Sequence, residues 1–173
     1  MSKKGYGSHP FIYEYIRNKK CRRIMEIGIA DGDNAANMIE AALENFPPQR
    51  IEYFGFDKFD KKSQLQKVKN KLSEKNCKFR LYKGNSVKTI SEQVENLPKM
   101  DLIFIDGGHD YPIVQKDWKN SKKLINEKTG VFFHNYNFSG PKKGVNNISK
   151  EKFSIKILDP DRDYKTALVK KRK

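Results

Sequence analysis

Short strand-like segments alternate with helix-like segments along most of this chain. The strand-like segments, rich in apolar residues, are 23–28, 51–57, 77–83, 101–106 and 130–135. The helix-like segments are 9–18, 33–45, 61–75, 86–96 and 112–126, with a further short helix at 144–150. Because alternating strands and helices build a parallel sheet covered by helices on both faces, the pattern predicts an α/β fold.

The end of the chain departs from this alternation. Two strand-like segments, 153–158 and 164–171, are separated only by the turn sequence DPDRD. Two strands joined by a short turn pair in antiparallel fashion, and mixed sheets often carry such a strand near an edge. The sequence therefore predicts a doubly wound, seven-stranded, mostly parallel sheet with a reversed terminal strand.

The chain has 173 residues, enough for one domain with a substantial core, and no repeat or linker divides it. We expect a single domain over 1–173, with a basic helical segment at 1–22 and a basic tail at 170–173. No apolar run reaches the roughly 18 to 20 residues that cross a bilayer, and no signal peptide is recognisable. Cys21 and Cys77 lack metal-ligand spacing, so we interpret them as reduced thiols of a cytoplasmic protein.

The formal net charge of +15 favours polyanionic partners such as nucleic acid or an anionic membrane surface. Lysine far outnumbers arginine, however, whereas nucleic-acid surfaces usually use arginine and exposed aromatic rings as well. Nucleic acid is therefore one partner to consider, and biased composition is the competing explanation of the charge.

A glycine turn follows the first strand-like segment, with the sequence EIGIADG at 26–32. The spacing of its glycines differs from the dinucleotide-binding pattern G-x-G-x-x-G, and no Walker sequence follows. Ligands of doubly wound sheets bind outside the carboxyl ends of the strands, where this turn is expected. Glycine lets the backbone approach a ligand closely, and the carboxylate of Glu26 needs hydrogen-bond partners if it is buried.

The order of these motifs resembles that of class I S-adenosylmethionine-dependent methyltransferases. The turn at 26–32 is similar to their Glu/Asp-x-Gly-x-x-x-Gly motif, and Asp57 stands where their second strand ends on an acid. DLIFIDGGHDY at 101–111 is similar to their fourth-strand motif, and GVFFHNYNFSGPKKGV at 130–145 to their fifth-strand segment. The resemblance covers about residues 20–171 and is nearest to the small-molecule O-methyltransferase-like branch with Asp-Gly-x-His after the fourth strand.

This resemblance implies S-adenosylmethionine as the cofactor and also implies its site. The residues that it places at the cofactor are Glu26, Gly28, Gly32, Asp57, Asn85 and Asp106. Asp57 would accept hydrogen bonds from the ribose hydroxyl groups, and Glu26 would be held near the amino end of the cofactor. Asn85 stands where an acid often contacts the adenine amino group, and its amide oxygen can still accept that bond.

The resemblance also implies an active edge where the fourth and fifth strands end. His109 and Asp106 are the predicted catalytic residues, with His109 as the base that removes a proton from an acceptor hydroxyl group. In metal-dependent relatives the acid at the position of Asp106 binds Mg²⁺ together with a second acid, where this chain has the neutral Asn135. We therefore predict a weakened Mg²⁺ site with Asp106 and Asn135 as ligands. His134 adjoins two phenylalanines and is predicted to be a core histidine.

The predicted activity is methyl transfer to an oxygen atom of a small-molecule or glycan-like acceptor. The segment 137–147 contains Gly140, Pro141 and Gly144, which predicts a mobile or turned loop over that acceptor. Two main alternatives stay open: a nucleic-acid methyltransferase that uses the basic surface, and a non-catalytic binding protein on the same scaffold. A nicotinamide-dependent oxidoreductase is a more distant alternative, and the sequence does not define the oligomeric state.

Overall fold

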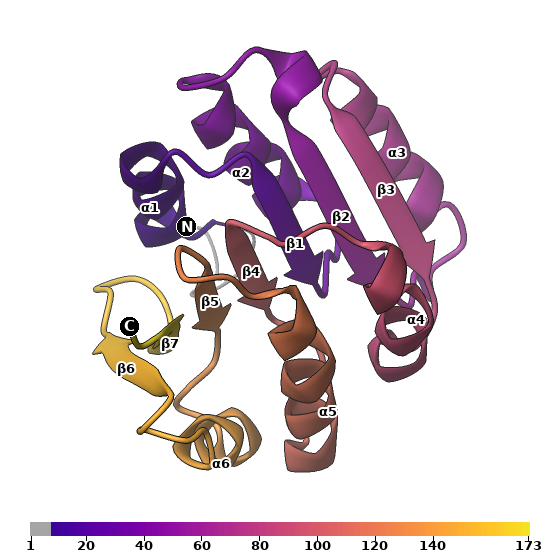
Figure 1. The fold of residues 1–173 in the computed structure, drawn as a ribbon. Coiled ribbons are helices and arrows are strands. Elements are labelled where there is room, and N and C mark those ends of the chain that lie inside the picture. Colours follow the sequence, from indigo (N-terminus) through magenta and orange to yellow (C-terminus); the bar gives the residue numbers. More distant parts are fainter. Residues whose placement is uncertain (1–7) are drawn as a thin grey trace.

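The computed structural model describes residues 8–173, which contain one seven-stranded sheet. The strands are β1 (Arg23–Ile27), β2 (Glu52–Asp57), β3 (Lys78–Lys83), β4 (Leu102–Ile105), β5 (Gly130–Phe133), β6 (Phe153–Leu158) and β7 (Thr166–Lys171). Their order across the sheet is β3-β2-β1-β4-β5-β7-β6, and β7 runs antiparallel to both of its neighbours (Figure 1). The predicted doubly wound, mostly parallel sheet with a reversed terminal strand is confirmed.

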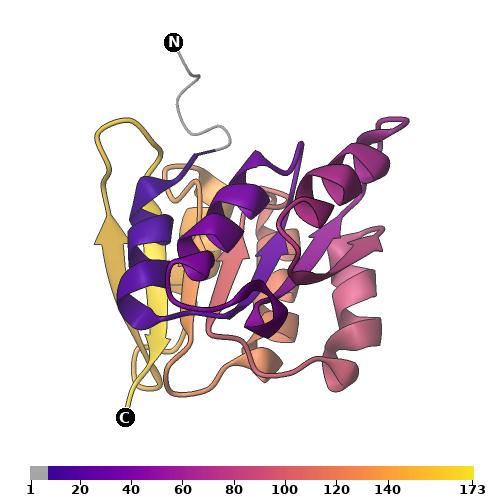
Figure 2. The ribbon, with the colours of Figure 1, turned by 90° about the horizontal axis from the view of Figure 1, so that it is seen from above.

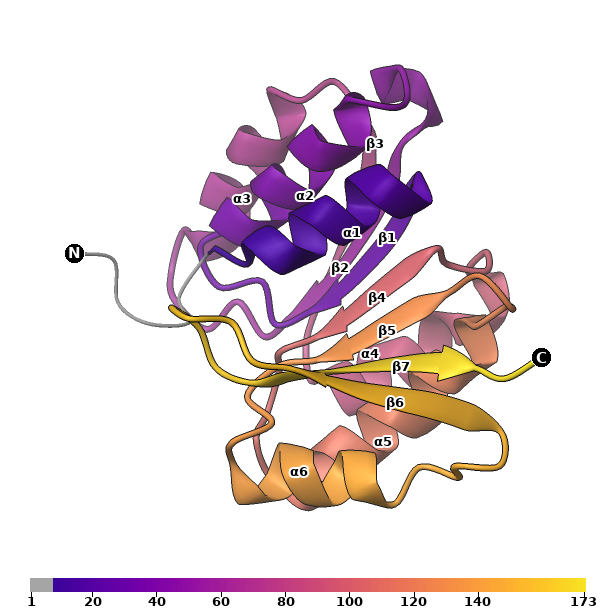
Figure 3. The same ribbon diagram turned by 90° about the vertical axis from the view of Figure 1, so that its left-hand side faces the viewer.

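Helices cover both faces of the sheet, as Figure 3 shows. One face carries α1 (Pro10–Lys19), α2 (Asp33–Leu43) and α3 (Gln64–Ser73), and the other carries α4 (Ser86–Gln93), α5 (Tyr111–Ser121) and α6 (Ser139–Asn146). Short 3-10 turns lie at Pro48–Arg50, Val94–Asn96 and Lys122–Leu124. Each face has its own cluster of buried apolar side chains. Within residues 8–173, no helix combines the length and apolar character needed to cross a membrane.

The burial pattern explains why the central strands form where they do. Every residue of β4 and of β5 is buried, as expected for short apolar strands covered by helices on both faces. The edge strand β3 instead contains only exposed and half-buried residues. The strands with continuous apolar sequence therefore lie in the middle of the sheet, and the more polar strand β3 lies at its edge.

The segment after β5 differs from the sequence prediction. The loop expected at 137–147 is wrong, because the helix α6 spans Ser139–Asn146. The short helix expected at 144–150 is present with other bounds, since α6 begins and ends earlier. Pro141 lies in the first turn, where its missing N–H group costs no helical hydrogen bond. Gly140, buried in the same turn, has no room for a side chain. The residues that indicate a loop therefore allow close packing, and α6 is a packed helix.

The N-terminal helix lies beside the end of the chain, as Figure 2 shows for α1 and β7. There Nζ of Lys170 is 5.7 Å from the centroid of the Tyr15 ring. α1 accounts for the helix predicted within 1–22, of which residues 1–7 lie outside the described residues. The basic tail predicted at 170–173 begins two residues later, because β7 extends through its first two lysines.

The strand order reverses between β1 and β4, which lie next to each other in the middle of the sheet. From β1 the chain continues outward through β2 to β3, and from β4 it continues in the other direction through β5. In such sheets ligands bind in the crevice outside the carboxyl ends of the strands at this switch point. The fold therefore directs attention to the loops that follow β1, β2, β4 and β5.

Candidate active site

A pocket of about 660 Å³ opens where β1, β2, β4 and β5 end, and we call it the strand-end pocket. Its volume lies within the range of about 300–1,000 Å³ that is usual for small-molecule sites. The predicted site residues in its wall are Gly28, Asp57, Asn85, Asp106, His109 and Asn135. Glu26 and Gly32 are not part of the wall. Residues that end or follow five different strands therefore share one pocket.

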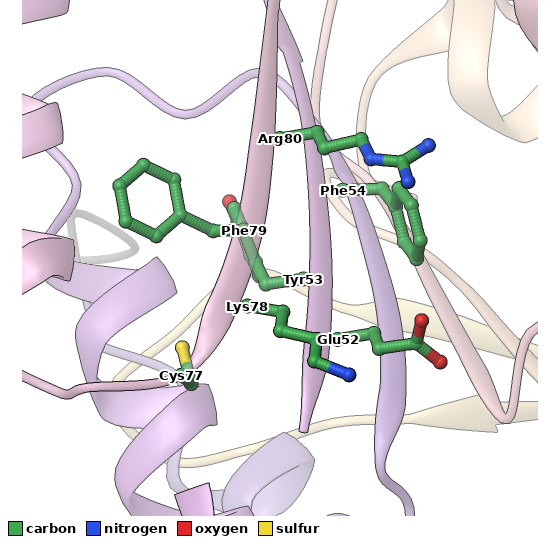
Figure 4. Close-up of a pocket in the computed structure, with 7 residues that line it drawn as sticks. All are labelled: Glu52, Tyr53, Phe54, Cys77, Lys78, Phe79 and Arg80. Carbon is green, nitrogen blue, oxygen red and sulfur yellow. The ribbon is translucent and has the colours of Figure 1, made fainter. Parts of the chain in front are cut away.

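A second hollow, of about 410 Å³, lies at the edge of the sheet where β2 and β3 begin (Figure 4). It is lined by residues 52–54 and 77–80, and the guanidinium group of Arg80 lies 5.8 Å from the ring centroid of Phe54. None of the predicted site residues lines it. Because doubly wound sheets bind ligands at the opposite, carboxyl ends of their strands, the strand-end pocket is the candidate active site.

The glycine turn after β1 contributes to the strand-end pocket through its backbone. Gly28 has a φ of +87°, and a Cβ at this position would lie 2.2 Å from the backbone oxygen of Asp106. Only glycine fits, because the loops after β1 and β4 touch through their main chains. Gly32 has a φ of +84° and begins α2, and a Cβ there would meet the side chain of Val68 on α3. Gly28 thus shapes the pocket, whereas Gly32 shapes the helix contact behind it.

Asp57, the last residue of β2, fixes the position of this glycine turn. Its Oδ2 accepts hydrogen bonds from the backbone N–H groups of Ile29 at 2.7 Å and Ala30 at 3.1 Å. Its Oδ1 accepts one from the N–H group of Phe59 at 2.7 Å. A carboxylate has about four acceptor positions, so three are used and one remains for a ligand. Asp57 therefore holds the loop as well as lining the pocket.

Glu26 lies behind the pocket wall, with only 1% of its surface exposed. Nδ2 of Asn34 donates a hydrogen bond to its Oε1 at 2.7 Å, and the Tyr53 hydroxyl group donates one to its Oε2. Burial raises the pKa of Glu26 to about 8, although these two hydrogen bonds act in the opposite direction. Each oxygen of its carboxyl group thus has a hydrogen-bond partner inside the protein, and its link to a cofactor stays a prediction.

Asn85 lines the strand-end pocket at the start of α4. Its Oδ1 accepts a hydrogen bond from the backbone N–H group of Val87 at 3.0 Å and so caps the helix. One lone pair of this oxygen and the side-chain NH₂ group remain available. The predicted contact with adenine fits this placement but stays a prediction.

Asp106, His109 and Asn135 meet where β4 and β5 end. Nε2 of the half-exposed His109 lies 4.0 Å from Oδ1 of Asp106. The Asp106 carboxylate is the main cause that raises the pKa of His109, whereas partial burial lowers it and Asn135 adds a smaller upward effect. Asn135 has a φ of +55°, a conformation that asparagine adopts more readily than most residues. The predicted base and its two predicted neighbours are therefore together in the pocket.

Behind Asp106 lies a buried row of alternating carboxylates and imidazoles. Nδ1 of His134 is 2.9 Å from Oδ1 of Asp106, and its Nε2 is 2.8 Å from Oδ1 of Asp163. Nδ1 of His9 is in turn 2.5 Å from Oδ2 of Asp163. We call these four residues the buried charge network. The prediction that His134 is a core histidine is confirmed by its burial and by hydrogen bonds at both ring nitrogens.

The protonation of this network follows from its contacts. Burial lowers the pKa of His134, but the hydrogen bonds and charges of Asp106 and Asp163 outweigh it and raise that pKa to about 9. Burial likewise raises the pKa of Asp163, but His134 and His9 outweigh it and hold that pKa well below its usual range. His134 is therefore a cation at neutral pH. Sequence reasoning missed His9 and Asp163, because no motif marks a histidine before Pro10 or one acid of DPDRD.

Aromatic side chains complete the wall near His109. Phe138 lies 5.1 Å from His109 and 5.3 Å from Tyr164, measured between ring centroids. The first turn of α6 packs closely against the loop after β4 that carries His109, since a Cβ at Gly140 would lie 1.8 Å from the His109 carbonyl oxygen. Phe138 and Tyr164 both line the strand-end pocket, which gives it an apolar, planar surface beside the predicted base.

The groups around Asp106 do not fit the predicted Mg²⁺ ion. Mg²⁺ prefers oxygen ligands and is usually held by carboxylates. Oδ1 of Asp106 is already paired with the cationic His134, and Asn135 adds an amide oxygen without charge. The other nearby donors described above are the imidazoles of His9, His109 and His134, and imidazoles suit transition metals better than Mg²⁺.

The sheet order, the glycine turn after β1 and the acids that follow β2 and β4 around one pocket together define the class I methyltransferase architecture. Comparison with protein families then gives the particular family. The sequence model of the "Methyltransferase domain" family matches residues 25–136, which is more than half of the chain. The chain belongs to this methyltransferase family, and the matched segment contains every predicted site residue.

Solved structures show the same fold. An O-methyltransferase from Bacillus cereus in complex with SAH is 16% identical, with a TM-score of 0.76 over 94% of this chain and 79% of that one. TomG, an O-methyltransferase from Streptomyces achromogenes in complex with SAM, is 16% identical, with a TM-score of 0.73 over 96% and 81%. CalS11, a TDP-rhamnose 3′-O-methyltransferase of calicheamicin biosynthesis, is 15% identical, with a TM-score of 0.76 over 91% and 76%. No curated protein matches the chain by sequence.

Proposed function

We propose that the chain transfers a methyl group from S-adenosylmethionine to a hydroxyl oxygen of a small-molecule acceptor in the strand-end pocket. The observation that carries this proposal is the convergence of Gly28, Asp57, Asn85 and Asp106 on one pocket that also contains His109. The relatives add support, because two of the three solved structures described above hold SAM or SAH and all three are named as O-methyltransferases.

The half of the pocket formed by β1 and β2 suits the cofactor. Gly28 leaves the backbone open to close approach, and Asp57 keeps one acceptor position for a ribose hydroxyl group. The remaining capacity of the Asn85 side chain suits the adenine amino group. S-adenosylmethionine would supply an electrophilic methyl group on a positively charged sulfur. The negative charges of Asp57 and Asp106 favour the binding of such a cation.

The half formed by β4 and β5 suits the chemistry. His109 accepts the proton of the acceptor hydroxyl group, and Asp106 orients and strengthens this base. S-adenosylmethionine, held by Gly28, Asp57 and Asn85, would supply the methyl group to the acceptor oxygen and would leave as S-adenosylhomocysteine, and the proton of that oxygen would stay on His109. Catalysis of this kind depends mainly on positioning two reactants in line.

The walls near His109 indicate a small acceptor with an apolar face. Phe138, Tyr164 and Ile113 offer apolar surface beside the base, and α6 closes that side of the pocket as a packed helix. The alternative of a nucleic-acid acceptor has the net charge in its favour but no support among the relatives described above. A non-catalytic binding protein on this scaffold would bind the cofactor without turnover.

Calorimetric titration with S-adenosylmethionine and S-adenosylhomocysteine, each with Mg²⁺ and with a chelator, tests this proposal. We expect micromolar binding of both compounds, followed by turnover in a screen of phenols and sugars. Absence of binding under every condition would overturn the proposal. Binding without turnover on any hydroxyl acceptor would instead favour the non-catalytic alternative.

A further inference from the structure

The buried charge network joins three distant parts of the chain. His9 precedes α1, His134 follows β5, and Asp163 lies in the loop between β6 and β7. These three residues are at most 5% exposed, whereas Asp106 reaches the strand-end pocket. The rings of His9 and His134 lie 4.5 Å apart, and Asp163 contacts both. The network therefore connects the pocket to a fully buried interior.

The contacts of His134 define its protonation without reference to any ligand. Its two ring nitrogens each lie within 3 Å of a carboxylate oxygen, one from Asp106 and one from Asp163. A neutral imidazole has one N–H donor, whereas an imidazolium has two. Carboxylate oxygens accept and do not donate when ionised, so both contacts are satisfied together only by the cation. The upward shift of the His134 pKa agrees with this reading.

We propose that this network takes the place of a divalent metal ion, with His134 as a fixed positive charge that positions Asp106 and with Asp163 and His9 as positioning residues that hold His134. A fixed cation against Asp106 repels a divalent ion at the same carboxylate. Asn135, which adds no negative charge, also fits an edge without a metal. The consequence for methyl transfer rests on the proposed function, whereas the network itself does not.

The same side chains also match the ligand set of a transition-metal site, which is the alternative to this proposal. One atom each of His9, Asp106 and His134 lie within 4.8 Å of one another, and two imidazoles with one carboxylate are a common ligand set for transition metals. Binding of such an ion would require a ring nitrogen of His134 to lose its proton. A test must therefore report on that proton directly.

Nitrogen-15 NMR of the three histidines provides this test, because His9, His109 and His134 are the only ones in the sequence. His9→Gln and His109→Gln assign the signals. We expect both ring nitrogens of His134 to carry protons at pH 7, and we expect added Mg²⁺ or Zn²⁺ to leave its signals unchanged. A single N–H proton on His134, or micromolar Zn²⁺ or Mg²⁺ shifting the His9 and His134 signals, would overturn the proposal.

Substitution of Asp163 tests its positioning role. Asp163→Asn should remove the imidazolium signature of His134 and lower kcat by about tenfold or more, with KM and affinity for S-adenosylhomocysteine nearly unchanged. Asp161→Asn, at an exposed position of the same loop, is the matched control. If Asp163→Asn does not fold, His9→Gln serves as the second variant. Unchanged His134 signals together with an unchanged kcat in His9→Gln would contradict the positioning role of His9. Failure of cofactor binding in a protein that retains the imidazolium would overturn the proposed function alone.

Discussion

The two halves of the strand-end pocket differ in what holds them in place. In the β1–β2 half, backbone groups carry the contacts: Asp57 accepts N–H groups of Ile29 and Ala30, and Gly28 touches the main chain after β4. In the β4–β5 half, side chains carry them, through the ion pairs of His134 with Asp106 and Asp163. One half therefore depends on loop conformation, and the other on the balance of buried charge.

This difference separates binding from turnover and stability. Changes at Gly28 or Asp57, which line the β1–β2 half, should act mainly on affinity for the cofactor, because they release a loop without leaving a buried charge unpaired. Changes in the β4–β5 half should act on turnover or on the free energy of unfolding, because a buried ion without its partner is costly. The predictions below test this separation, beginning with the largest expected effect.

His109→Ala should lower kcat by about 10²- to 10⁴-fold, because it removes the proposed general base. Affinity for S-adenosylhomocysteine should stay unchanged, since His109 lies in the β4–β5 half. Steady-state kinetics and calorimetry measure the two quantities on the same preparation. The pH profile of the wild-type protein gives a second test. Because Asp106 raises the pKa of His109, activity should rise with pH around a midpoint above about 6.5, the usual pKa of histidine. A variant with wild-type turnover would place the base elsewhere.

His134→Ala should lower the free energy of unfolding by about 3–5 kcal/mol at pH 6, because it leaves Asp106 and Asp163 without their shared cation. Urea denaturation of wild type and variant measures the difference. His109→Ala is the matched control, since it removes an imidazole at a half-exposed position. Equal losses in the two variants would contradict the difference between a buried network and an exposed side chain.

The effect of His134→Ala should also depend on pH. The pKa of His134 is raised to about 9 in the folded protein, above its unfolded value of about 6.5. A raised histidine pKa stabilises the fold fully below the unfolded value, and this stabilisation is lost as the pH rises through about 9. The difference between wild type and variant should therefore be largest at pH 6 and shrink toward pH 10. A constant difference would show that packing, not charge, explains the loss.

The same division separates what the sequence can and cannot predict. Gly28 and Asp57 are predictable because each follows a strand at a fixed spacing, and strand ends of a parallel sheet meet at one edge. The pairing of His9 with Asp163 is not, because 154 residues separate two ordinary loop residues that only the folded sheet brings together. Glu26 is an intermediate case, since its motif marks a turn that borders the pocket while its own side chain lies behind the pocket wall.

The sequence prediction for the segment that forms helix α6 fails for a different reason. Glycine and proline have low helix propensity, so a reading of 137–147 by propensity alone gives a loop. The structure favours a helix because Gly140 and Gly144 pack against the loop after β4 and against α5, at distances that exclude a side chain. Tertiary contact thus overrides local preference at the point where the β4–β5 half is closed.

Asp57→Ala should weaken binding of S-adenosylhomocysteine by about 1–3 kcal/mol, roughly 5-fold to 150-fold. The substitution removes one acceptor for the ligand and releases the N–H groups of Ile29 and Ala30. Asp60→Asn, at an exposed residue of the same pocket, is the control and should have a smaller effect. Unchanged affinity in Asp57→Ala would refute the placement of the ribose.

Glu26→Gln should have the smallest effect on binding, with affinity for S-adenosylhomocysteine changed by less than about threefold, or under about 0.7 kcal/mol. A glutamine can accept the hydrogen bond of Asn34 and donate to the Tyr53 hydroxyl oxygen, so the turn behind the pocket wall is preserved. Calorimetry at pH 7 measures this change. A tenfold loss would mean that the carboxylate acts on the cofactor directly, as the sequence motif suggests.

Thermal unfolding of Glu26→Gln sharpens the comparison further. The pKa of Glu26 is raised to about 8 in the folded protein, whereas glutamate in an unfolded chain has a pKa of about 4.3. The unfolded state therefore releases this proton first, and Glu26 destabilises the fold increasingly from about pH 4.3 to about pH 8. The melting temperature of Glu26→Gln relative to wild type should accordingly rise between pH 5 and pH 8. In the β1–β2 half ionisation of a buried side chain opposes folding, whereas in the β4–β5 half the charge of His134 supports it.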